Sequence, residues 1–574
     1  MIALDGSRRR ATAWVLLLAA CGPTPGDSDS DDTTTSASTT EGDATTTTAA
    51  EPTTSDAPDT TVAPTTTDAL PADCLEGDVF IDEHDTEAAI AALAGVECIT
   101  GALSFLNVDR PDLKGLESLR QVGDYFQISQ SKFVSLAGLE NLERVGHLGI
   151  TSGPMLTDIG ALANLQEITD GDLNLDGIPI TSLPFHHLEH VSGAVQISNT
   201  GLTSLAGLDG LTSIDEFLAV SFNDALTNLA GLDSLASVGR FVLIERNPQL
   251  LDLTGLAALA EIGEYLEVEQ NDALQLLGSP ALTTIGGDLR IVDNAALQSL
   301  DLPALTTVGA DLKLADNDAL ASLAGFESLT AVGAALQLTS NPGLLTAEGF
   351  PALESVGLLA VEFNGGLTAL AGFDALVAVD TLRIYGNQAL TEIAGFGAFM
   401  TSPGSLEIAS NDSLAALKGF SQLRQIRRVD LVGNPELASL VGLGQLETVD
   451  EQFTLSDLAV TDLSDLASLR SAALHIGHNP ALTSLAGLEG LESAEFVNVE
   501  ANPALTSVAA VQLGAGGSLA TAEGLSIIGN LALATCDAVA VLEAMTVKPT
   551  FLCILGNQDD VCQDIEQDCV LETP

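Results

Sequence analysis

The chain has 574 residues, of which 46% are hydrophobic and only 4% aromatic, so its core must be built from Leu, Val, Ile and Ala. Its 79 acidic residues outnumber the 19 basic ones and give a formal net charge of −60. A charge of this sign and size repels phosphates and anionic bilayer surfaces, which argues against nucleic acid as a partner. We interpret the acidic residues as a solvated surface.

The first residues have the pattern of an export signal. Arg8–Arg10 are basic, and the apolar run Ala11–Ala20 is shorter than the roughly 20 residues that span a bilayer as a helix. Leu18-Ala19-Ala20-Cys21 resembles the bacterial lipobox, in which the Cys is lipidated and the chain is cut before it. The resemblance implies a lipoprotein signal peptide over 1–20 and a membrane anchor at Cys21. Gly22 fits the sorting pattern for the outer membrane, so we expect a lipid-anchored protein of the bacterial cell envelope.

The next segment, residues 21–73, has the composition of a tether. After Cys21 it consists mostly of Thr, Ser, Asp, Ala and Pro and contains no aromatic residue. Such a stretch cannot bury enough apolar surface to offset the entropy lost on ordering. We predict a disordered tether here, without a fold or a site of its own.

From about residue 100 onward the chain repeats every 22 to 24 residues or so, which is typical of a solenoid. Each unit is marked by an Asn with Leu three residues later and apolar residues five and three positions earlier. The apolar alternation predicts a short strand with one buried face, and the Asn at a fixed bend predicts a buried ladder that bonds loop backbone groups. The ladder residues are Asn223, Asn247, Asn271, Asn294, Asn317, Asn341, Asn364, Asn387, Asn411, Asn434, Asn479, Asn502 and Asn530.

The rest of the unit reads Leu-x-x-Leu-x-Gly-Leu-x-x-Leu-x-x-Val-Gly, as in Leu320–Gly333, where Phe326 replaces one Leu. Leu residues three apart, with Gly and Asn-Pro steps between units, indicate short extended pieces joined by bends. The sequence therefore predicts a mainly β, leucine-rich solenoid of roughly eighteen coils over 106–535. We expect it to lie between an N-terminal cap at 74–105 and a Cys-rich C-terminal cap at 536–574.

The consensus Leu-x-x-Val-Gly-x-x-Leu-x-Ile-x-x-Asn-x-x-Leu resembles the receptor L-domain, a right-handed β-helical module of receptor ectodomains and bacterial surface lipoproteins. The opening agrees: Cys74 and Asp78–Ile81 precede a predicted short helix over 86–94 and then Cys98–Gly101. The resemblance covers 74 to about 560. It implies a right-handed solenoid and a Cys74–Cys98 bridge across the N-terminal cap. Far more coils are present than in one receptor module, and shape alone does not transfer function.

The cysteines other than Cys21 lie only at the two ends of the expected solenoid. Six is an even number, and in an exported chain it favours three disulfides. Open solenoid ends expose apolar surface and strand edges, so stapled caps are expected there, with a capping helix over 537–545. Zinc is disfavoured because no paired CxxC spacing occurs. Two pairings of the last four are open: Cys536–Cys562 with Cys553–Cys569, and Cys536–Cys553 with Cys562–Cys569.

Residues four and two positions before the ladder Asn should point outward and form a candidate binding face. This face is varied and charged but poor in the aromatic anchors that binding surfaces usually carry. Tyr385 beside Arg383 is the one modest aromatic candidate that we identify on it. The residues that we assign to this face are Glu267, Arg290, Lys313, Arg383, Tyr385 and Glu407.

No signature of catalysis was found, because Gly-rich phosphate loops and the GxSxG and HExxH motifs do not occur. Few Lys and Arg residues are available to stabilise charge in a polysaccharide-cleaving site. We therefore predict no catalytic residues, no metal and no cofactor. The expected function is recognition or adhesion at the cell surface, with an unknown protein or cell-surface ligand as partner. The alternatives are a passive envelope component without a ligand and, more remotely, a β-helix enzyme acting on polysaccharide.

Overall fold

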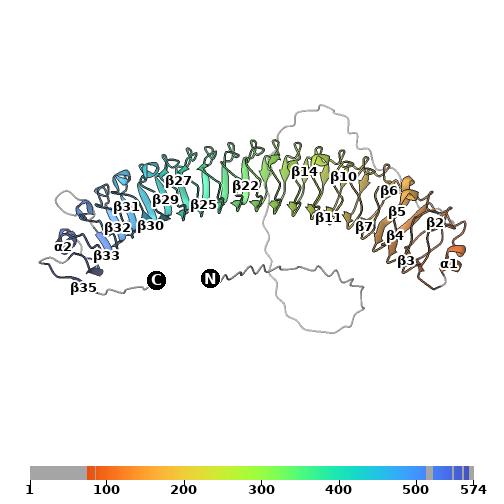
Figure 1. Cartoon of the computed structure of the whole chain (residues 1–574), viewed down its shortest axis with the longest axis horizontal. Helices are drawn as coiled ribbons and strands as arrows, with labels where there is room; N and C mark the ends of the chain where they lie inside the picture. The colour runs from red at the N-terminus through yellow and green to blue at the C-terminus, as the bar shows by residue number, and fades with distance from the viewer. Residues whose placement is uncertain (1–73, 85, 512–520, 546–548, 559–561, 568–574) are drawn as a thin grey trace, which may run out of the picture. The chain divides into compact units, whose positions relative to one another are not determined.

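The computed structural model describes residues 74–84, 86–511, 521–545, 549–558 and 562–567. These residues all belong to one unit, Ala69–Pro574. The predicted signal peptide, the lipidation site Cys21, the tether over 21–73 and Cys569 lie outside the described residues. The described part is a parallel β-solenoid of about 20 turns, against roughly eighteen expected from the repeat. Its coils are stacked in chain order (Figure 1).

One principal strand in each coil pairs in parallel with the principal strands of the coils before and after it. The register is strict, as where Val268 faces Ile244 on one side and Ile291 on the other. The principal strands are β1 (Val79–Ile81), β3 (Leu103–Leu106), β4 (Gln121–Ser129), β5 (Arg144–Thr151), β7 (Leu173–Asp176), β9 (Val195–Ser198), β11 (Leu218–Ser221), β13 (Val242–Glu245), β15 (Leu266–Glu269), β18 (Leu289–Val292), β21 (Leu312–Ala315), β22 (Ala331–Thr339), β23 (Ser355–Glu362), β25 (Ala378–Tyr385), β27 (Thr401–Ala409), β29 (Gln425–Asn434), β30 (Thr448–Leu458), β31 (Ser471–Gly477), β32 (Ser493–Glu500), β33 (Thr521–Ile528) and β34 (Phe551–Leu555).

Shorter elements complete each coil. A second line of two-residue strands runs just ahead of the principal strands and merges with them in the long strands such as β22, giving one 30-stranded sheet. This second line comprises β2 (Cys98–Ile99), β6 (Glu167–Ile168), β8 (His190–Val191), β10 (Ser213–Ile214), β12 (Ser237–Val238), β14 (Glu261–Ile262), β17 (Thr284–Ile285) and β20 (Thr307–Val308). Separate small sheets are formed by β16 (Leu276–Gly278) with β19 (Ser299–Asp301), and by β24 (Ala369–Leu370), β26 (Glu392–Ile393) and β28 (Ala416–Leu417).

Helices are short and few in the described part. The α-helices are α1 (Thr86–Ala92) and α2 (Thr535–Ala544), close to the two cap helices predicted from the sequence. The 3-10 turns are η1 (Gly160–Asn164), η2 (Thr254–Leu256), η3 (Val441–Leu443), η4 (Ser464–Leu466) and η5 (Ala509–Val511). No helix among the described residues is long and apolar enough to cross a membrane.

The core is a continuous stack of similar layers of buried apolar side chains. Along a principal strand the inward side chains are fully buried, as for Leu289 and Ile291, while Arg290 between them is exposed. Each such aliphatic side chain contributes about 1.5–3 kcal/mol by leaving water. Where Phe326 replaces the consensus Leu, a buried column of rings begins. It continues through Phe350, Phe373, Phe396 and Phe420, with ring centroids 5.1–5.6 Å apart.

The ladder Asn side chains are buried and bond three coils together. The Asn271 backbone N–H donates to Oδ1 of Asn294 (3.1 Å), and the Asn271 side-chain amide donates to the carbonyl oxygens of Ile244 (2.9 Å) and Glu269 (3.0 Å). The same bonds recur from Asn223 to Asn411, and all thirteen ladder Asn residues are 0% exposed. They satisfy backbone groups at the bend that would otherwise be buried without partners.

The backbone at this bend is left-handed. The residue before a ladder Asn has φ near +55°, for example Gln270 (55°) and Asp293 (56°). A non-glycine residue in this region costs about 1–2 kcal/mol, so the bend persists because the ladder bonds hold it. At the next corner the consensus Gly is required for close approach. A Cβ atom on Gly263 would clash with the carbonyl oxygen of Gly239 in the preceding coil.

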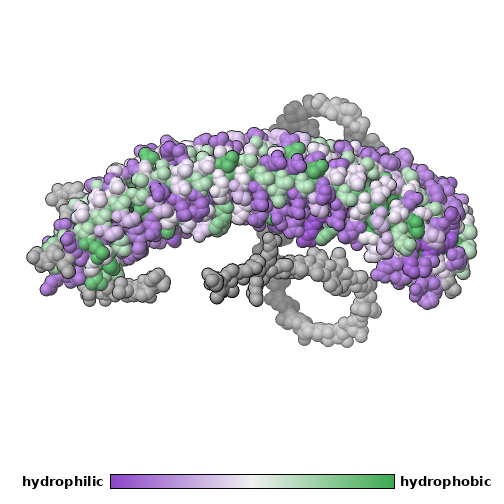
Figure 2. All heavy atoms as spheres, in the orientation of Figure 1, coloured by the Kyte–Doolittle hydropathy of each residue, from purple (hydrophilic) through white to green (hydrophobic). Residues whose placement is uncertain are grey.

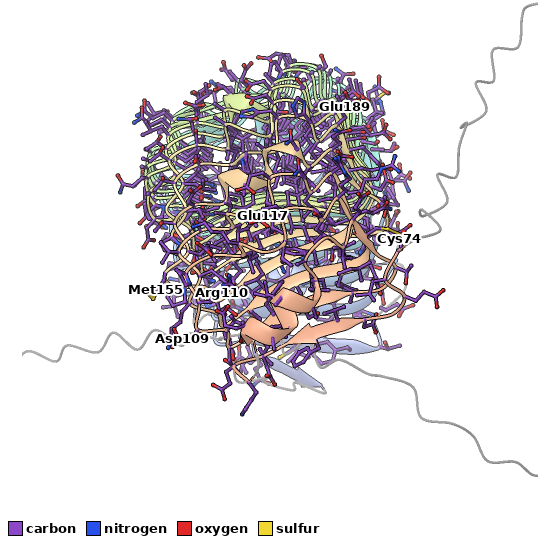
Figure 3. All side chains as sticks on the ribbon, turned by 90° about the vertical axis from the view of Figure 1, so that its right-hand side faces the viewer. Cys74, Asp109, Arg110, Glu117, Met155 and Glu189 are labelled. Atoms are coloured by element: carbon purple, nitrogen blue, oxygen red, sulfur yellow. A yellow bond between two sulfur atoms is a disulfide. The ribbon has the colours of Figure 1, made fainter. Side chains whose placement is uncertain are left out.

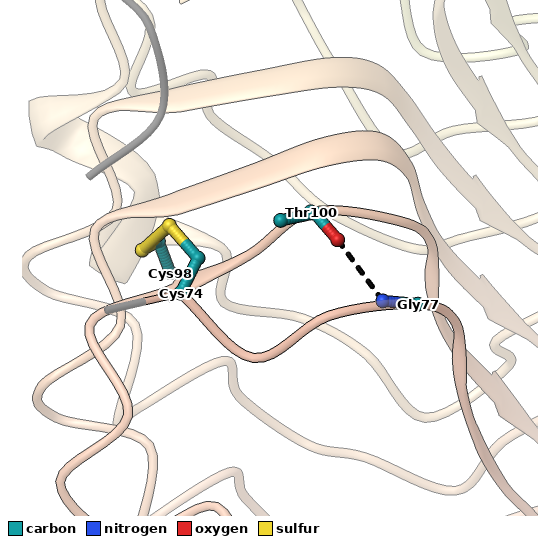
Figure 4. The surroundings of a disulfide bond; sticks show 4 residues. All are labelled: Cys74, Gly77, Cys98 and Thr100. Atoms are coloured by element: carbon teal, nitrogen blue, oxygen red, sulfur yellow. Dashed lines mark hydrogen bonds between the residues drawn. A yellow bond between two sulfur atoms is a disulfide. The ribbon is translucent and has the colours of Figure 1, made fainter. Parts of the chain in front are cut away.

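Both ends are closed by a disulfide and a short helix. At the N-terminal end Cys74 bonds to Cys98, and the Gly77 N–H donates to Oγ1 of Thr100 (3.0 Å) across the same two segments (Figure 4). At the C-terminal end Cys536 bonds to Cys562, so the alternative Cys536–Cys553 pairing is excluded. Cys553 is itself disulfide-bonded. Strand β35 (Ile565–Gln567) runs antiparallel to β34, whereas the coils of the solenoid pair in parallel.

Candidate recognition face

The register of the sheet places the predicted binding residues in two outward columns. Glu267, Arg290 and Lys313 lie side by side in successive coils, and Arg383 and Glu407 form a second run in the same column. The two runs are separated by Gln337 and Ala360. Tyr385 lies in the neighbouring column, two residues after Arg383. These positions make one continuous strand face, but their role in binding stays a prediction.

Most charges on this face are paired within the chain. Arg383 Nε lies 2.8 Å from Glu407 Oε2, and Nη1 lies 3.8 Å from Glu362 Oε1. The hydrogen bond to Glu407 raises the pKa of Arg383. Arg290 Nη2 is 2.6 Å from Asp288 Oδ2. Surface pairs of this kind contribute at most about 1 kcal/mol each to stability. The space-filling view in Figure 2 shows hydrophilic and hydrophobic residues interspersed on the face of the solenoid turned to the viewer.

Glu267 is an exception because it sits beside other carboxylates. Burial raises the pKa of Glu267 first, and a hydrogen bond with Glu269 and the charge of Glu245 raise it further. Burial also raises the pKa of the nearby Tyr265 hydroxyl. The ionised form of a half-buried carboxylate is destabilised when other carboxylates lie beside it. A ligand that brings a positive charge would relieve this repulsion.

A stack of aromatic rings on the outer face was missed by the sequence analysis. Phe217, Phe241 and Tyr265 occupy the same outward position in three successive coils, with ring centroids 4.4 and 4.6 Å apart and interplanar angles of 8° and 4°. Arg240 lies 5.7 Å from the Phe241 ring and bonds Glu216 and Glu264, each at 3.0 Å. The sequence does contain this pattern, because in each of the three coils an aromatic residue stands directly before the first inward residue of the principal strand.

The second feature that sequence reasoning missed is a hollow of about 430 Å³ over Ala473. It arises because the outward segment between two buried residues differs in length between adjacent coils. One residue, Ala473, separates the buried Ala472 and Leu474 in β31. The corresponding segments are longer in the flanking coils. They are Asp450–Gln452, between Val449 and Phe453 of β30, and Glu495–Phe496, between Ala494 and Val497 of β32.

The side chains of the longer segments form the walls of this hollow. Its lining also includes Arg428 and His475. A second hollow of about 490 Å³, lined in part by Glu407 and Asp430, shares Arg428 and Glu451 with the first. The principal-strand face is therefore concave over β27 to β32. We call the 430 Å³ hollow the Ala473 hollow.

Buried polar atoms without partners gather beside the Ala473 hollow. In the described residues three buried side-chain atoms lack a hydrogen-bond partner: Ser192 Oγ, Thr454 Oγ1 and Asn498 Oδ1. Thr454 and Asn498 flank His475 in the outward column, and Asn498 Nδ2 lies 2.9 Å from His475 Nδ1. Thr454 is only 9% exposed. Unpartnered buried polar groups are uncommon in folded proteins and mark positions where a ligand can supply the missing bond.

A third hollow lies nearer the N-terminal end of the solenoid, beside β6 and β8. This hollow of about 560 Å³ lies along the edge formed by Glu167, His187, Glu189 and His190. Figure 3, which looks along the coils from the N-terminal end, places Glu189 on a different part of the cross-section from Asp109 and Arg110. Across the described ranges no group of three or more His, Cys, Asp or Glu side chains could hold a metal ion.

Comparisons with known proteins find only distant structural similarity. No protein-family model and no curated protein matches the chain. Among solved structures, an internalin from Listeria monocytogenes is 14% identical, with a TM-score of 0.17, covering 78% of this chain and 84% of that chain. A TLR13–ssRNA13 complex is 13% identical, with a TM-score of 0.20, covering 81% and 86%. The fold is a leucine-rich-repeat-like β-solenoid. Scores this low carry no argument about ligands.

Proposed function

We propose that this chain is a non-enzymatic recognition protein of the bacterial cell surface, anchored by lipid at Cys21 and binding a protein ligand on its principal-strand face. The observation that carries the proposal is the contrast between the two sides of that strand. Inward positions repeat the same residue types in coil after coil, whereas outward positions vary and include an aromatic stack and a concave stretch. Core packing requires the repeated inward residues, but it does not require the variation at the outward positions, which binding of a ligand would explain.

The anchor and tether support the same proposal. A lipidated Cys21 followed by a tether over 21–73 would present the solenoid at a distance from the membrane. Metabolic labelling with an alkyne fatty acid tests the anchor. We expect label on the full chain and none on a Cys21→Ser variant, and equal labelling of the two would contradict the lipid anchor.

Site-specific photo-crosslinking on intact cells tests the recognition face. A photo-reactive residue at Gln337 lies in the outward column, while the same residue at Asp272 lies in the exposed bend after Asn271 and serves as control. We expect a discrete crosslinked product from Gln337 and none from Asp272. Equal products from both positions, or none from Gln337, would contradict binding at this face.

A passive envelope component is the second candidate, because many outer charges are already paired within the chain. This candidate predicts that deletion changes envelope properties while no saturable partner is found. A polysaccharide-acting enzyme is the remote third candidate, which a glycan hydrolysis screen with the purified chain would test.

A further inference from the structure

The Ala473 hollow has an unbalanced charge. Among the residues that line it, the carboxylates of Asp450, Glu451 and Glu495 stand against one guanidinium, that of Arg428. Arg428 offsets them only in part, because its Nε lies 2.5 Å from Asp430 Oδ2 and its Nη2 lies 3.3 Å from Asp430 Oδ1. The hollow therefore attracts cations, and its walls exclude part of the solvent that would screen this attraction.

The three carboxylates differ in how far they are neutralised. Glu451 pairs with Arg427 at 3.2 Å, and Asp450 accepts hydrogen bonds from Gln425 at 3.0 and 3.1 Å. Within the described part of the chain, Glu495 forms no ion pair and accepts no side-chain hydrogen bond. Glu495 is therefore the carboxylate that a ligand cation would meet.

The remaining wall suits an extended organic cation better than a metal ion. Phe496, which follows Glu495, offers a half-buried aromatic ring, and cations pack favourably on such rings. Behind this lining, Thr454 pairs in register with the lining residue His475 and has a hydroxyl without a partner. A volume of about 430 Å³ is within the range of roughly 300–1,000 Å³ typical of ligand pockets.

We propose that the Ala473 hollow binds the guanidinium or ammonium group of an Arg or Lys side chain on a basic segment of a protein partner. The cation lies between the Glu495 carboxylate and the Phe496 ring, above Ala473. The proposal deepens the recognition function proposed above and rests on it, because it names the chemistry of the ligand and the coils that bind it.

Fluorescence anisotropy with the purified full chain and labelled short peptides tests this proposal. One peptide carries Arg, one carries Lys in its place, and one carries citrulline, which has the shape of Arg without its charge. We expect the Arg and Lys peptides to bind at least about tenfold more tightly than the citrulline peptide at low salt. Equal binding of Arg and citrulline peptides would overturn the proposal. Agmatine, a free guanidinium amine, binding more tightly than the Arg peptide would overturn the assignment to a peptide ligand.

Variants locate the site. Ala473→Phe fills the hollow and should weaken Arg-peptide binding at least about tenfold, whereas Ala473→Ser should leave it unchanged. Phe is accepted at the equivalent outward position, where Phe217 and Phe241 stand, so Ala473→Phe is expected to fold. Unchanged Arg-peptide affinity in Ala473→Phe, with an unchanged circular-dichroism melting curve, would overturn the proposal.

Matched charge variants separate specific from general attraction. Glu495→Gln should weaken binding about fivefold, while Glu436→Gln, the same change at the exposed bend after β29, should not. Equal weakening by both would show attraction to the acidic chain as a whole and would overturn the site. If a partner crosslinks at Gln337 and its binding is insensitive to Ala473→Phe, the recognition function stands and this inference fails.

Discussion

The coils from Asn223 to Asn434 and the coils of β30 to β32 share one fold but differ in regularity. In the first region every coil carries the ladder Asn. In the second, Leu458 occupies the ladder position opposite Asn434, and the backbone N–H of Leu458 donates directly to Asn479 Oδ1 (3.0 Å). The Ala473 hollow and the partnerless Thr454 and Asn498 atoms also lie in the second region. Of these two regions, the second departs from the repeat and also holds the Ala473 hollow.

The difference shows which part of the unit is constrained. Inward positions must match between coils, because a gap or an unpaired amide would be buried. Outward segments can gain or lose residues, as in β31, because solvent fills the space. Local sequence irregularity in a solenoid is therefore a guide to sites, whereas regularity is a guide to fold.

The largest expected effect is loss of a ladder Asn in the regular region. Asn317→Leu removes the side-chain bonds to the Ile291 and Ala315 carbonyls and the acceptor of the Asn294 N–H. Buried groups left unpaired cost about 1–3 kcal/mol each, so we expect a loss of about 4 kcal/mol. Hydrogen exchange of the amides around Asn317 measures this free energy. A loss below about 1 kcal/mol would show that the ladder does not hold the coils.

The C-terminal disulfide gives the next effect. Cys536→Ser with Cys562→Ser opens a 26-residue separation and should cost about 3 kcal/mol of local stability. Because the ladder is interrupted at Leu458, we expect fraying from β34 back to β30 to stop at Asn434. Limited proteolysis followed by mass spectrometry maps the new cleavage sites. Cleavage spread evenly through the regular region would contradict this boundary.

Reversal of an outer ion pair should have a smaller effect. Arg383→Glu places a carboxylate beside Glu407 and Glu362, and we expect a loss of about 1 kcal/mol or less. The swap Arg383→Glu with Glu407→Arg restores the pair and should recover the melting temperature. Failure of the swap to recover stability would mean that Arg383 acts through packing.

The smallest expected effect depends on pH. Because the pKa of Glu267 is raised in the folded chain, its stabilising contribution is present below the ordinary value of 4.5 and is lost as pH rises through the raised value. Glu267→Gln should therefore raise the melting temperature slightly near pH 7 and leave it unchanged near pH 4. Melting curves at the two pH values, with Glu436→Gln as control, measure the effect. A gain at both pH values would point to packing instead.

Much of the fold could be predicted from the sequence, because inward positions obey simple rules. The ladder spacing and the apolar alternation predicted a leucine-rich β-solenoid, and the described coils have that architecture. The spacing of the last four Cys residues did not determine the disulfide partner of Cys536. That partner depends on how the chain after α2 folds back, and the structure pairs Cys536 with Cys562. The Ala473 hollow could not be predicted without the pairing register of three coils. The short segment at Ala473 forms a hollow only because the paired segments of β30 and β32 are longer.

The closing strand β35 also bears on self-association. A stack of in-register parallel strands could in principle be continued by the first coil of another molecule, which would give a growing filament. Because β35 runs antiparallel to β34, it occupies the hydrogen-bonding edge that an incoming parallel coil would need. At the other end Cys74 is bonded to Cys98, and α1 lies between β1 and β2 in the chain. Caps of this kind let a chain of many interchangeable units keep a fixed length.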